Sequence, residues 1–281
     1  MPPTPLIINL APTGMVPTKA DTPHVPTCAA EVAEDVAACR ELGVAIVHLH
    51  ARDGDGRPSH RADDVAPLVA AVRDVDPELI VCVTCSGRLV SSVDDRAEAL
   101  ELDGALRPEM ASLTLGSNNF ASAPSINPPD VIRELASRMR ERGIKPELEA
   151  FEPGMVAFGR RLVDEGLLDE PCYVNVLLGN LGTAPLQPHA LAFRAEIPDR
   201  WTWALAGLGR FQLDASALAI ALGGHVRIGL EDNIWFDRAR TVPATNAALV
   251  RRIHELAELL ERPVATPAQA RAQLGLVTDR R

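Results

Sequence analysis

The sequence of 281 residues lacks an excess of basic residues, a long apolar run and a regular set of cysteines. Lys and Arg total 28 against 38 Asp and Glu, a formal net charge of −10, so nothing attracts a nucleic acid or an anionic membrane. No apolar run approaches the roughly 18 residues that span a bilayer, and no basic segment of the signal-peptide kind opens the sequence. We therefore expect a cytoplasmic protein with small-molecule ligands and no nucleic-acid or membrane partner.

The five cysteines are odd in number and scattered, which does not fit a disulfide framework. Cys82 and Cys85 form a C-x-x-C motif within a β-branched run, where residues three apart face opposite sides and cannot share a metal. We expect this pair to be buried, reduced thiols. The composition, 47% hydrophobic and 23% charged, is that of an ordinary globular protein. A chain of this length can bury a core that needs neither disulfides nor a structural metal.

Short β-branched runs recur along the sequence and begin near residues 6, 44, 79, 111, 146, 173, 201 and 225. The first and last starts differ by 225 − 6 = 219 residues, or about 31 per repeat, which is close to one βαβ unit. Stretches with helical spacing lie between most of the runs, among them 29–42, 62–75, 129–143 and 244–262. This alternation predicts a single-domain (β/α)₈ TIM barrel over residues 1–281, with a C-terminal extension from about residue 263.

An open doubly wound α/β sheet is the main competing fold. Its Gly-rich G-x-G-x-x-G turn should follow the first strand, but here that strand runs into Asn-Leu-Ala-Pro-Thr-Gly at residues 9–14. In a barrel, active-site residues lie at the carboxyl ends of the strands. Polar side chains stand at most of these ends: Asn9, His48, His50, Thr84, Ser86, Arg88, Ser112, Thr114, Glu147, Glu149, Arg227, Glu231, Asp232 and Asn233.

His48 and His50 are two residues apart on one strand, so both imidazoles point to the same face and can converge on one metal ion. Strands two and eight are two spacings apart around a closed barrel, which makes Glu231 the natural third ligand. Two histidines and one carboxylate with an open position are typical of catalytic Zn²⁺. The competing interpretation makes Glu231 a rim carboxylate in a salt bridge with Arg227.

Asp232 follows the proposed carboxylate ligand and could act as the general base that removes a proton next to a polarised carbonyl. An N-cap at the turn after the last strand is the alternative role for Asp232. Arg227 lies four residues before Glu231, so it can face inward and present a bidentate donor to a substrate carboxylate.

Together these motifs resemble the β-keto acid cleavage enzymes, whose named member is the 3-keto-5-aminohexanoate cleavage enzyme. The resemblance extends from about residue 4 to residue 272, and the H-x-H and G-L-E-D-N motifs in this order are its most specific part. The matching segments are P-T-G-M-V-P-T-K (12–19), I-V-H-L-H-A-R-D (46–53), G-R-P-S (56–59), P-E-M-A-S-L (108–113), P-E-L-E (146–149), A-G-L-G-R (206–210) and G-G-H-V-R-I-G-L-E-D-N-I-W (223–235).

The resemblance implies a Zn²⁺-dependent homotetramer that converts a β-keto acid and acetyl-CoA into acetoacetate and a new acyl-CoA by retro-Claisen chemistry. It implies zinc ligation by His48, His50 and Glu231, and a pair of Arg227 and Asp232 that orients the substrate and moves protons. It also implies positions around the reacting atoms for Glu149, Thr84 and Ser112, and substrate contacts for Val16, Ser86, Gly87 and Thr114. The hydroxyls of Thr84 and Ser112 are swapped relative to the Ser and Thr expected in the named member.

One position departs from the aminohexanoate enzyme, in which a Glu two residues after the T-G turn meets the substrate ammonium. Here Val16 stands at that position, and a valine cannot pair with a cation. We therefore expect a neutral, for example aliphatic, β-keto acid in place of an amino keto acid.

Other functions remain open from the sequence alone. A metal-dependent aldolase or acyl-CoA lyase would need no acetyl-CoA, and a non-catalytic sensor of metal or keto acid would need no base. An amidohydrolase also uses H-x-H, but on its first strand and with later histidines that this sequence lacks. No motif marks the CoA site, for which Arg88 and the loop 179–182 are candidates.

Overall fold

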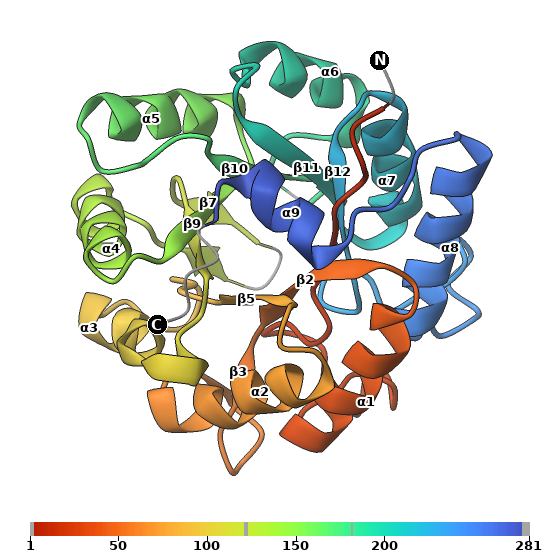
Figure 1. Cartoon of the computed structure of the whole chain (residues 1–281), viewed down its shortest axis with the longest axis horizontal. Coiled ribbons are helices and arrows are strands. Elements are labelled where there is room, and N and C mark those ends of the chain that lie inside the picture. The colour runs from red at the N-terminus through yellow and green to blue at the C-terminus, as the bar shows by residue number, and fades with distance from the viewer. Residues whose placement is uncertain (1–2, 121–122, 181, 277–281) are drawn as a thin grey trace.

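Eight parallel strands close into a barrel in the computed structural model, which describes residues 3–120, 123–180 and 182–276 (Figure 1). The predicted TIM barrel is therefore confirmed, and its strands match the eight β-branched runs. Around the barrel the hydrogen-bonded order is β1 (Ile8–Leu10), β12 (His225–Ile228), β11 (Thr202–Gly207), β10 (Tyr173–Leu178), β9 (Lys145–Ala150), β6 (Met110–Thr114), β5 (Ile80–Val83) and β2 (Val44–Leu49).

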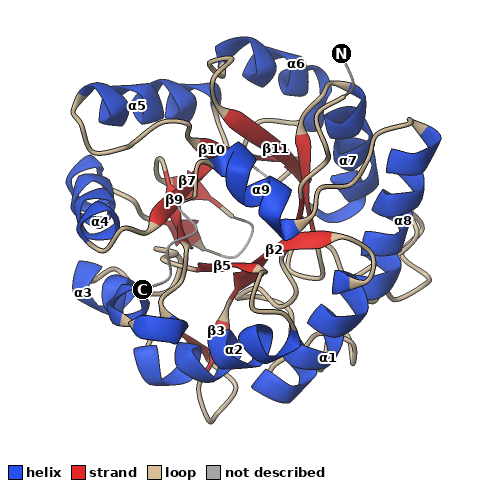
Figure 2. Cartoon of the chain, in the orientation of Figure 1, coloured by secondary structure: helices blue, strands red, loops and turns tan. Residues whose placement is uncertain are grey.

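Helices form an outer ring around these strands (Figure 2). They are α1 (Ala29–Arg40), α2 (Ala62–Val75), α3 (Val93–Ala97), α4 (Pro129–Glu141), α5 (Pro153–Asp164), α6 (Leu186–Glu196), α7 (Gln212–Ala221) and α8 (Asn246–Leu259). The last helix, α9 (Pro267–Leu274), is not part of this ring. The four predicted helical stretches correspond to α1, α2, α4 and α8. Gly43 and Gly143, both with positive φ, follow α1 and α4 and explain why these helices end slightly early.

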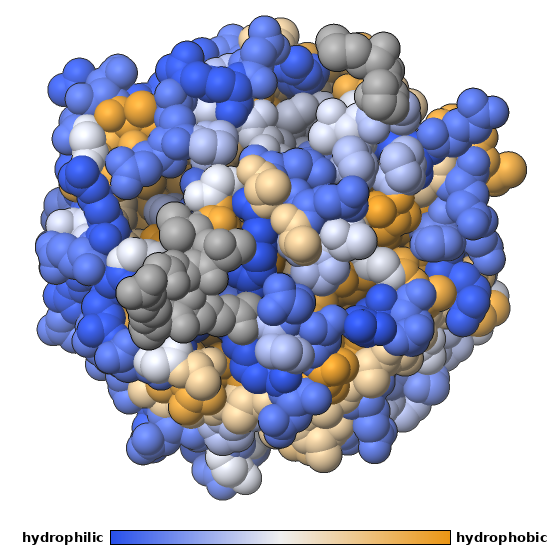
Figure 3. Space-filling model, viewed as in Figure 1, coloured by the Kyte–Doolittle hydropathy of each residue, from blue (hydrophilic) through white to orange (hydrophobic). Residues whose placement is uncertain are grey.

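Two short hairpins lie outside the barrel sheet. β3 (Ala51–Arg52) pairs with β4 (Pro58–Ser59), and β7 (Asn118–Asn119) pairs with β8 (Pro124–Ser125). In Figure 3, hydrophilic residues cover much of the outer surface on the face that carries α9. Within the described residues, we find no helix with the length and apolar character to cross a membrane.

The segment after Pro263 packs on the amino-terminal end of the barrel, where α9 lies across the ring of strands (Figure 1). Its side chains Ala270 and Leu274 join a buried cluster with Ile7, Ile46 and Ile80 from inside the barrel. This end is therefore filled by apolar packing, which leaves the carboxyl ends of the strands as the open end.

The barrel interior is polar toward the carboxyl ends of the strands. Asn9, His48, Glu147, Asn175 and Arg227 are each at most 1% exposed, although their strands could have been filled with aliphatic residues for stability alone. Such a buried polar layer costs free energy unless its members are bonded to one another or to a ligand. The polar layer therefore indicates a ligand-binding or catalytic site in this part of the barrel. In agreement with the expectation for the C-x-x-C motif, Cys82 and Cys85 belong to two different buried clusters.

Candidate active site

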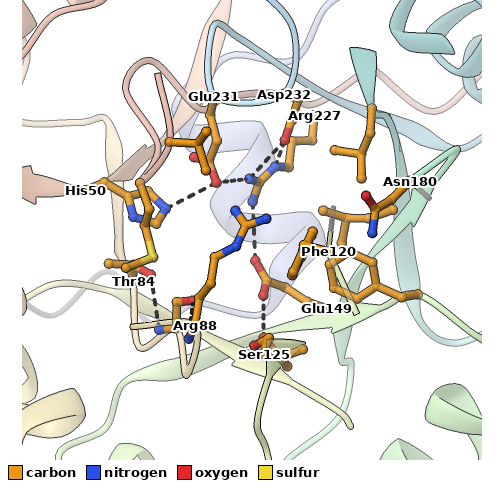
Figure 4. A pocket seen from close by; sticks show the side chains of 17 residues that line it. His50, Thr84, Arg88, Phe120, Ser125, Glu149, Asn180, Arg227, Glu231 and Asp232 are labelled. Carbon is orange, nitrogen blue, oxygen red and sulfur yellow. Dashed lines mark hydrogen bonds and ion pairs between the residues drawn. The ribbon is translucent and has the colours of Figure 1, made fainter. Parts of the chain in front are cut away.

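A cavity of about 230 Å³ opens at the carboxyl ends of the strands (Figure 4). Nine of the predicted site residues line it: Val16, His50, Thr84, Ser86, Thr114, Glu149, Arg227, Glu231 and Asp232. Its other walls are Met15, Arg88, Phe120, Ser125, Phe151, Leu177, Asn180 and Leu208. Of these, the sequence singles out Arg88 and, within the candidate loop 179–182, Asn180. The cavity is thus lined by both charged or polar groups and aromatic or aliphatic side chains.

The three predicted metal ligands converge. His48 Nε2 lies 3.1 Å from His50 Nε2, and His50 Nε2 lies 3.1 Å from Glu231 Oε1. β12 places Glu231 near the histidines because β1 is the only strand between β12 and β2 in the barrel. Contacts of about this length are expected between ligands that share one small cation.

Two observations show that this donor set fits a divalent cation. Glu231 Oε2 is buried and has no hydrogen-bond partner among the described residues, so one of its oxygens is available. The surrounding carboxylates of Glu147, Glu149, Glu231 and Asp232 outnumber the one guanidinium they share, that of Arg227. A divalent cation would balance this excess of buried negative charge.

Glu147 orients the first histidine. Its Oε2 lies 2.6 Å from His48 Nδ1, and its Oε1 accepts a hydrogen bond of 2.6 Å from Asn9 Nδ2. Burial alone would raise the pKa of Glu147, but His48, Arg227 and Asn9 lower it to about 2. The carboxylate therefore holds His48 with its proton on Nδ1 and its Nε2 free to bind a metal.

Glu147 stands at a predicted strand end, but it is not among the predicted site residues. Its signal was the spacing Glu147-x-Glu149, which puts both carboxylates on the inner face of β9 as His48-x-His50 does on β2. Only the closed barrel brings Glu147 within reach of a residue 99 positions away.

Glu147→Gln is expected to weaken zinc binding by roughly 10- to 100-fold, because the neutral amide is a poorer acceptor for the His48 proton. Competition with a chromogenic chelator would measure this change. Glu109→Gln is a matched control, since Glu109 also pairs with arginines, Arg73 and Arg271, but lies outside the cavity wall. Equal zinc affinity in Glu147→Gln and wild type would contradict the orienting role.

Arg227 is the central cation of the polar cluster and is 1% exposed. Its Nη2 donates to Glu231 Oε1 at 2.6 Å, its Nε to Asp232 Oδ2 at 3.2 Å, and its Nη1 to Glu149 Oε1 at 3.4 Å. The sequence predicted that Arg227 would offer its donors to a substrate carboxylate. All three of its nitrogens bond to protein carboxylates, so Arg227 holds the acidic residues in place, and its contact with a substrate stays a prediction.

The same contacts resolve the alternatives for Glu231 and Asp232. Glu231 meets both Arg227 and His50, so the predicted salt bridge and the predicted metal position coexist. Asp232 is 9% exposed, faces Arg227 and precedes no helix N-terminus, since the next helix, α8, begins at Asn246.

Burial raises the pKa of Asp232 and also that of Glu149, while Arg227 opposes the shift in both. A carboxylate with a raised pKa is a stronger base. Glu149 is further engaged, because its Oε2 accepts a 2.6 Å hydrogen bond from Thr114 Oγ1. Asp232 makes no contact as short as this one, because its two hydrogen bonds, both from Arg227, are 3.2 and 3.4 Å long. Asp232 is therefore the better suited of the two carboxylates to move protons.

Three predicted residues lie outside the cavity wall: His48, whose Nε2 meets that of His50, and Ser112 and Gly87. Ser112 is buried behind it, where its hydroxyl accepts a hydrogen bond of 3.0 Å from the backbone N–H of Cys85. Gly87 packs so closely that a Cβ would lie 2.5 Å from the carbonyl oxygen of Ile126. Both residues shape the loop after β5, which carries Ser86 and Arg88 into the cavity. Within the candidate CoA loop 179–182, residue 181 lies outside the described residues.

Val16 lies at the cavity mouth and is 55% exposed. Arg52 fixes its loop by donating to the carbonyl oxygens of Gly14, Met15 and Pro17. Gly14 has φ 69°, and a Cβ there would lie 2.6 Å from Glu231 Cγ, so only glycine fits. Val16, which replaces the Glu of the aminohexanoate enzyme, therefore lies in a loop that packs against Glu231, the candidate metal ligand.

The comparisons with known proteins identify relatives of this chain. A family model described as beta-keto acid cleavage enzyme matches residues 5–276, which confirms the resemblance predicted from the motifs. The chain is 40% identical to the 3-oxoadipate:acetyl-CoA acetyltransferase of Cupriavidus necator, over 97% of this chain and 95% of that protein. It is 35% identical to the 3-keto-5-aminohexanoate cleavage enzyme of Fusobacterium nucleatum, over 96% and 98%. The solved ternary complex of ObcA with a C4-CoA adduct and oxalate shares the fold, with a TM-score of 0.79 and 22% identity, over 92% of this chain and 68% of that chain.

Proposed function

This chain belongs to the beta-keto acid cleavage enzyme family, and we propose that it transfers the acyl group of a β-keto acid to CoA in exchange for the acetyl group of acetyl-CoA. The products are acetoacetate and a new acyl-CoA. The observation that carries this proposal is the juxtaposition of a candidate metal triad, His48, His50 and Glu231, with the buried pair of Arg227 and Asp232. All of these residues except His48 line one cavity.

We propose Zn²⁺ as the resident metal, held by His48, His50 and Glu231, because imidazole and carboxylate with an open position suit catalytic zinc. When bound, the ion would polarise the keto-acid carbonyl and lower the free energy of the carbanion that forms beside it. Glu147 would keep His48 in the tautomer that can bind the ion. A homotetramer, implied by the family resemblance, is part of the same proposal, and light scattering would test it.

Asp232 starts the reaction by taking a proton from the carbon between the ketone and the carboxylate of the keto acid. That carbon then forms a bond to the acetyl carbonyl carbon, and the thioester C–S bond breaks to release the CoA thiolate. The thiolate adds to the original ketone carbon, and the C–C bond breaks. The new acyl-CoA leaves, while Asp232 returns its proton to the carbon of acetoacetate.

Arg227 keeps Asp232 in place throughout these steps. Its Nε and Nη2 both contact the Asp232 carboxylate, at 3.2 and 3.4 Å, so the base cannot turn away from the cavity. Glu149, next to Arg227, and Thr114, bonded to it, line the same cavity, and Thr84 and Ser86 border the same space. Leu177, Leu208 and Phe151 limit the access of water, which would otherwise hydrolyse the thioester.

The proposed substrate is a β-keto acid without an amino group, because Val16 offers a cation no partner. The oxoadipate in the name of the Cupriavidus necator relative has no amino group either. Val16→Glu is expected to raise kcat/KM for an amino keto acid about 3- to 10-fold relative to an aliphatic one, since the new carboxylate can pair with the ammonium. Competition between the two substrates, followed by mass spectrometry, measures this ratio. Val16→Gln controls for size, and an unchanged ratio in Val16→Glu would refute the specificity role.

Incubation of the purified protein with acetyl-CoA and a panel of β-keto acids tests the function itself. We expect acetoacetate and a new acyl-CoA to form from a subset of the panel, and only when acetyl-CoA is present. Cleavage without acetyl-CoA would support a lyase instead. Binding of keto acids without any turnover would support a sensor.

A further inference from the structure

Arg88 is a second guanidinium inside the cavity, on the loop that follows β5 (Figure 4). It is half-buried, and its Cζ lies 3.7 Å from the centre of the Phe120 ring, on which the guanidinium stacks. Among the described residues no carboxylate oxygen lies within 4.0 Å of its nitrogens, and its Nε is buried without a hydrogen-bond partner. Arg88 therefore points free donors into the space where substrate must bind.

Arg88 and Arg227 differ in their carboxylate partners. Arg227 already contacts four carboxylates, so its donors are occupied and its charge is neutralised within the protein. Arg88 has the same planar set of N–H donors but lacks such partners. Partial burial of an unpaired cation costs free energy, and that cost is recovered when an anion from outside binds.

The loop that carries Arg88 is rigidly held, so the guanidinium has a fixed position. Arg96, 1% exposed, donates to the Cys85 carbonyl oxygen at 2.9 Å and to Asn127 Oδ1 at 2.7 Å. Gly87 fits between these groups with no room for a side chain, and the backbone N–H of Arg88 donates to Ser86 Oγ at 3.3 Å. Arg88 and the Phe120 ring on which it stacks both line the cavity, and the guanidinium extends into it (Figure 4).

We propose that Arg88 is the receptor for a carboxylate of the keto acid, the role that the sequence had assigned to Arg227. This inference rests on the proposed function, since it takes the ligand to be a β-keto acid. A planar carboxylate matches the edge of a stacked guanidinium with two parallel hydrogen bonds. The phosphates of CoA are a poorer match, because the long pantetheine arm separates them from the thioester, which must react deep in this small cavity.

Two carboxylates could supply this chemistry: the one next to the ketone in every β-keto acid, or one at the far end of a keto diacid. Calorimetric titration with acetoacetate, 3-oxoadipate and methyl acetoacetate distinguishes them, because these probes carry one, two and no carboxylates. The variants are Arg88→Met, which keeps an apolar stem over Phe120, and Arg88→Lys, which keeps the charge but loses the paired N–H donors of the guanidinium.

If Arg88 binds the carboxylate next to the ketone, Arg88→Met should weaken acetoacetate and 3-oxoadipate alike, by roughly 10- to 100-fold. If it binds the far carboxylate, only 3-oxoadipate should weaken. In either case Arg88→Lys should bind the affected acid with an affinity between those of the wild type and Arg88→Met. Methyl acetoacetate should bind the wild type and Arg88→Met equally well. Arg252→Gln is the matched control, since Arg252 also stacks on an aromatic ring, that of Phe236, but on α8 and outside the cavity wall.

Unchanged binding of both acids in Arg88→Met would overturn the inference. A rise in the KM for acetyl-CoA alone would overturn it as well, in favour of a CoA contact. Because binding needs no turnover, the two proposals can fail separately. If the wild type forms no acetoacetate but loses acid binding in Arg88→Met, the proposed function fails and the role of Arg88 stands.

Discussion

Asp232→Asn is expected to lower kcat by roughly 10²- to 10⁴-fold, the range that a positioned general base contributes. The amide keeps the size of the side chain and can still contact Arg227, but it cannot accept the proton of the keto acid. Single-turnover assays with acetyl-CoA and the preferred keto acid would measure this loss. Solvent deuterium exchange at the keto acid's reacting carbon, followed by NMR, should fall in parallel because it reports the same proton transfer.

Asp214→Asn is the matched control for this prediction. Asp214 also pairs with an arginine, Arg238, but this pair is on the outer surface of the molecule and does not line the cavity. Its kcat should equal that of the wild type. Asp232→Asn should still bind the keto acid within a few-fold of the wild-type affinity. If Asp232→Asn retains full exchange at the reacting carbon, another group is the base, and Glu149 becomes the first candidate.

His50→Ala is expected to abolish stoichiometric zinc binding and to lower turnover by at least about 10³-fold. The imidazole Nε2 lies between His48 Nε2 and Glu231 Oε1, so its loss removes the middle donor of the triad. Elemental analysis of the dialysed protein would count the metal, and we expect about one zinc per chain in the wild type. Chelation of the wild type should reproduce the loss, and added Zn²⁺ should reverse it.

His254→Ala serves as the control, because His254 lies on α8 and contacts Leu42 O and Glu258, away from the cavity. It should retain both zinc and activity. Full zinc content in dialysed His50→Ala would contradict the assignment of this histidine as a ligand. Full activity in the metal-free wild type would contradict the requirement for zinc.

The barrel and part of the site could be predicted because each depends on local patterns. The β-branched runs mark strands, and a strand turns every second side chain to the same face. For that reason His48-x-His50 predicts two converging imidazoles before any tertiary structure is known. Closure of the barrel then fixes β12 two strands away from β2, which brings Glu231 to His50.

The remaining features depend on contacts that no local pattern reveals. Arg227 faces inward as expected, but its four carboxylate neighbours come from β9 and from the turn after β12, and only their sum shows that it is occupied. Glu147 gains its role from a partner on β2. Arg88 is defined by the absence of a carboxylate near it, which a sequence cannot show. The closeness of Gly87 to Ile126 O likewise depends on how two loops pack.

Transfer of the acetyl group is the central claim, and isotope labelling tests it most directly. The protein is incubated with an aliphatic or dicarboxylic β-keto acid and with acetyl-CoA that carries ¹³C in both acetyl carbons. We expect both labelled carbons to appear in acetoacetate, and the new acyl-CoA to contain none. Unlabelled acetoacetate, or labelled acetyl-CoA that stays intact while the keto acid is cleaved, would contradict this claim.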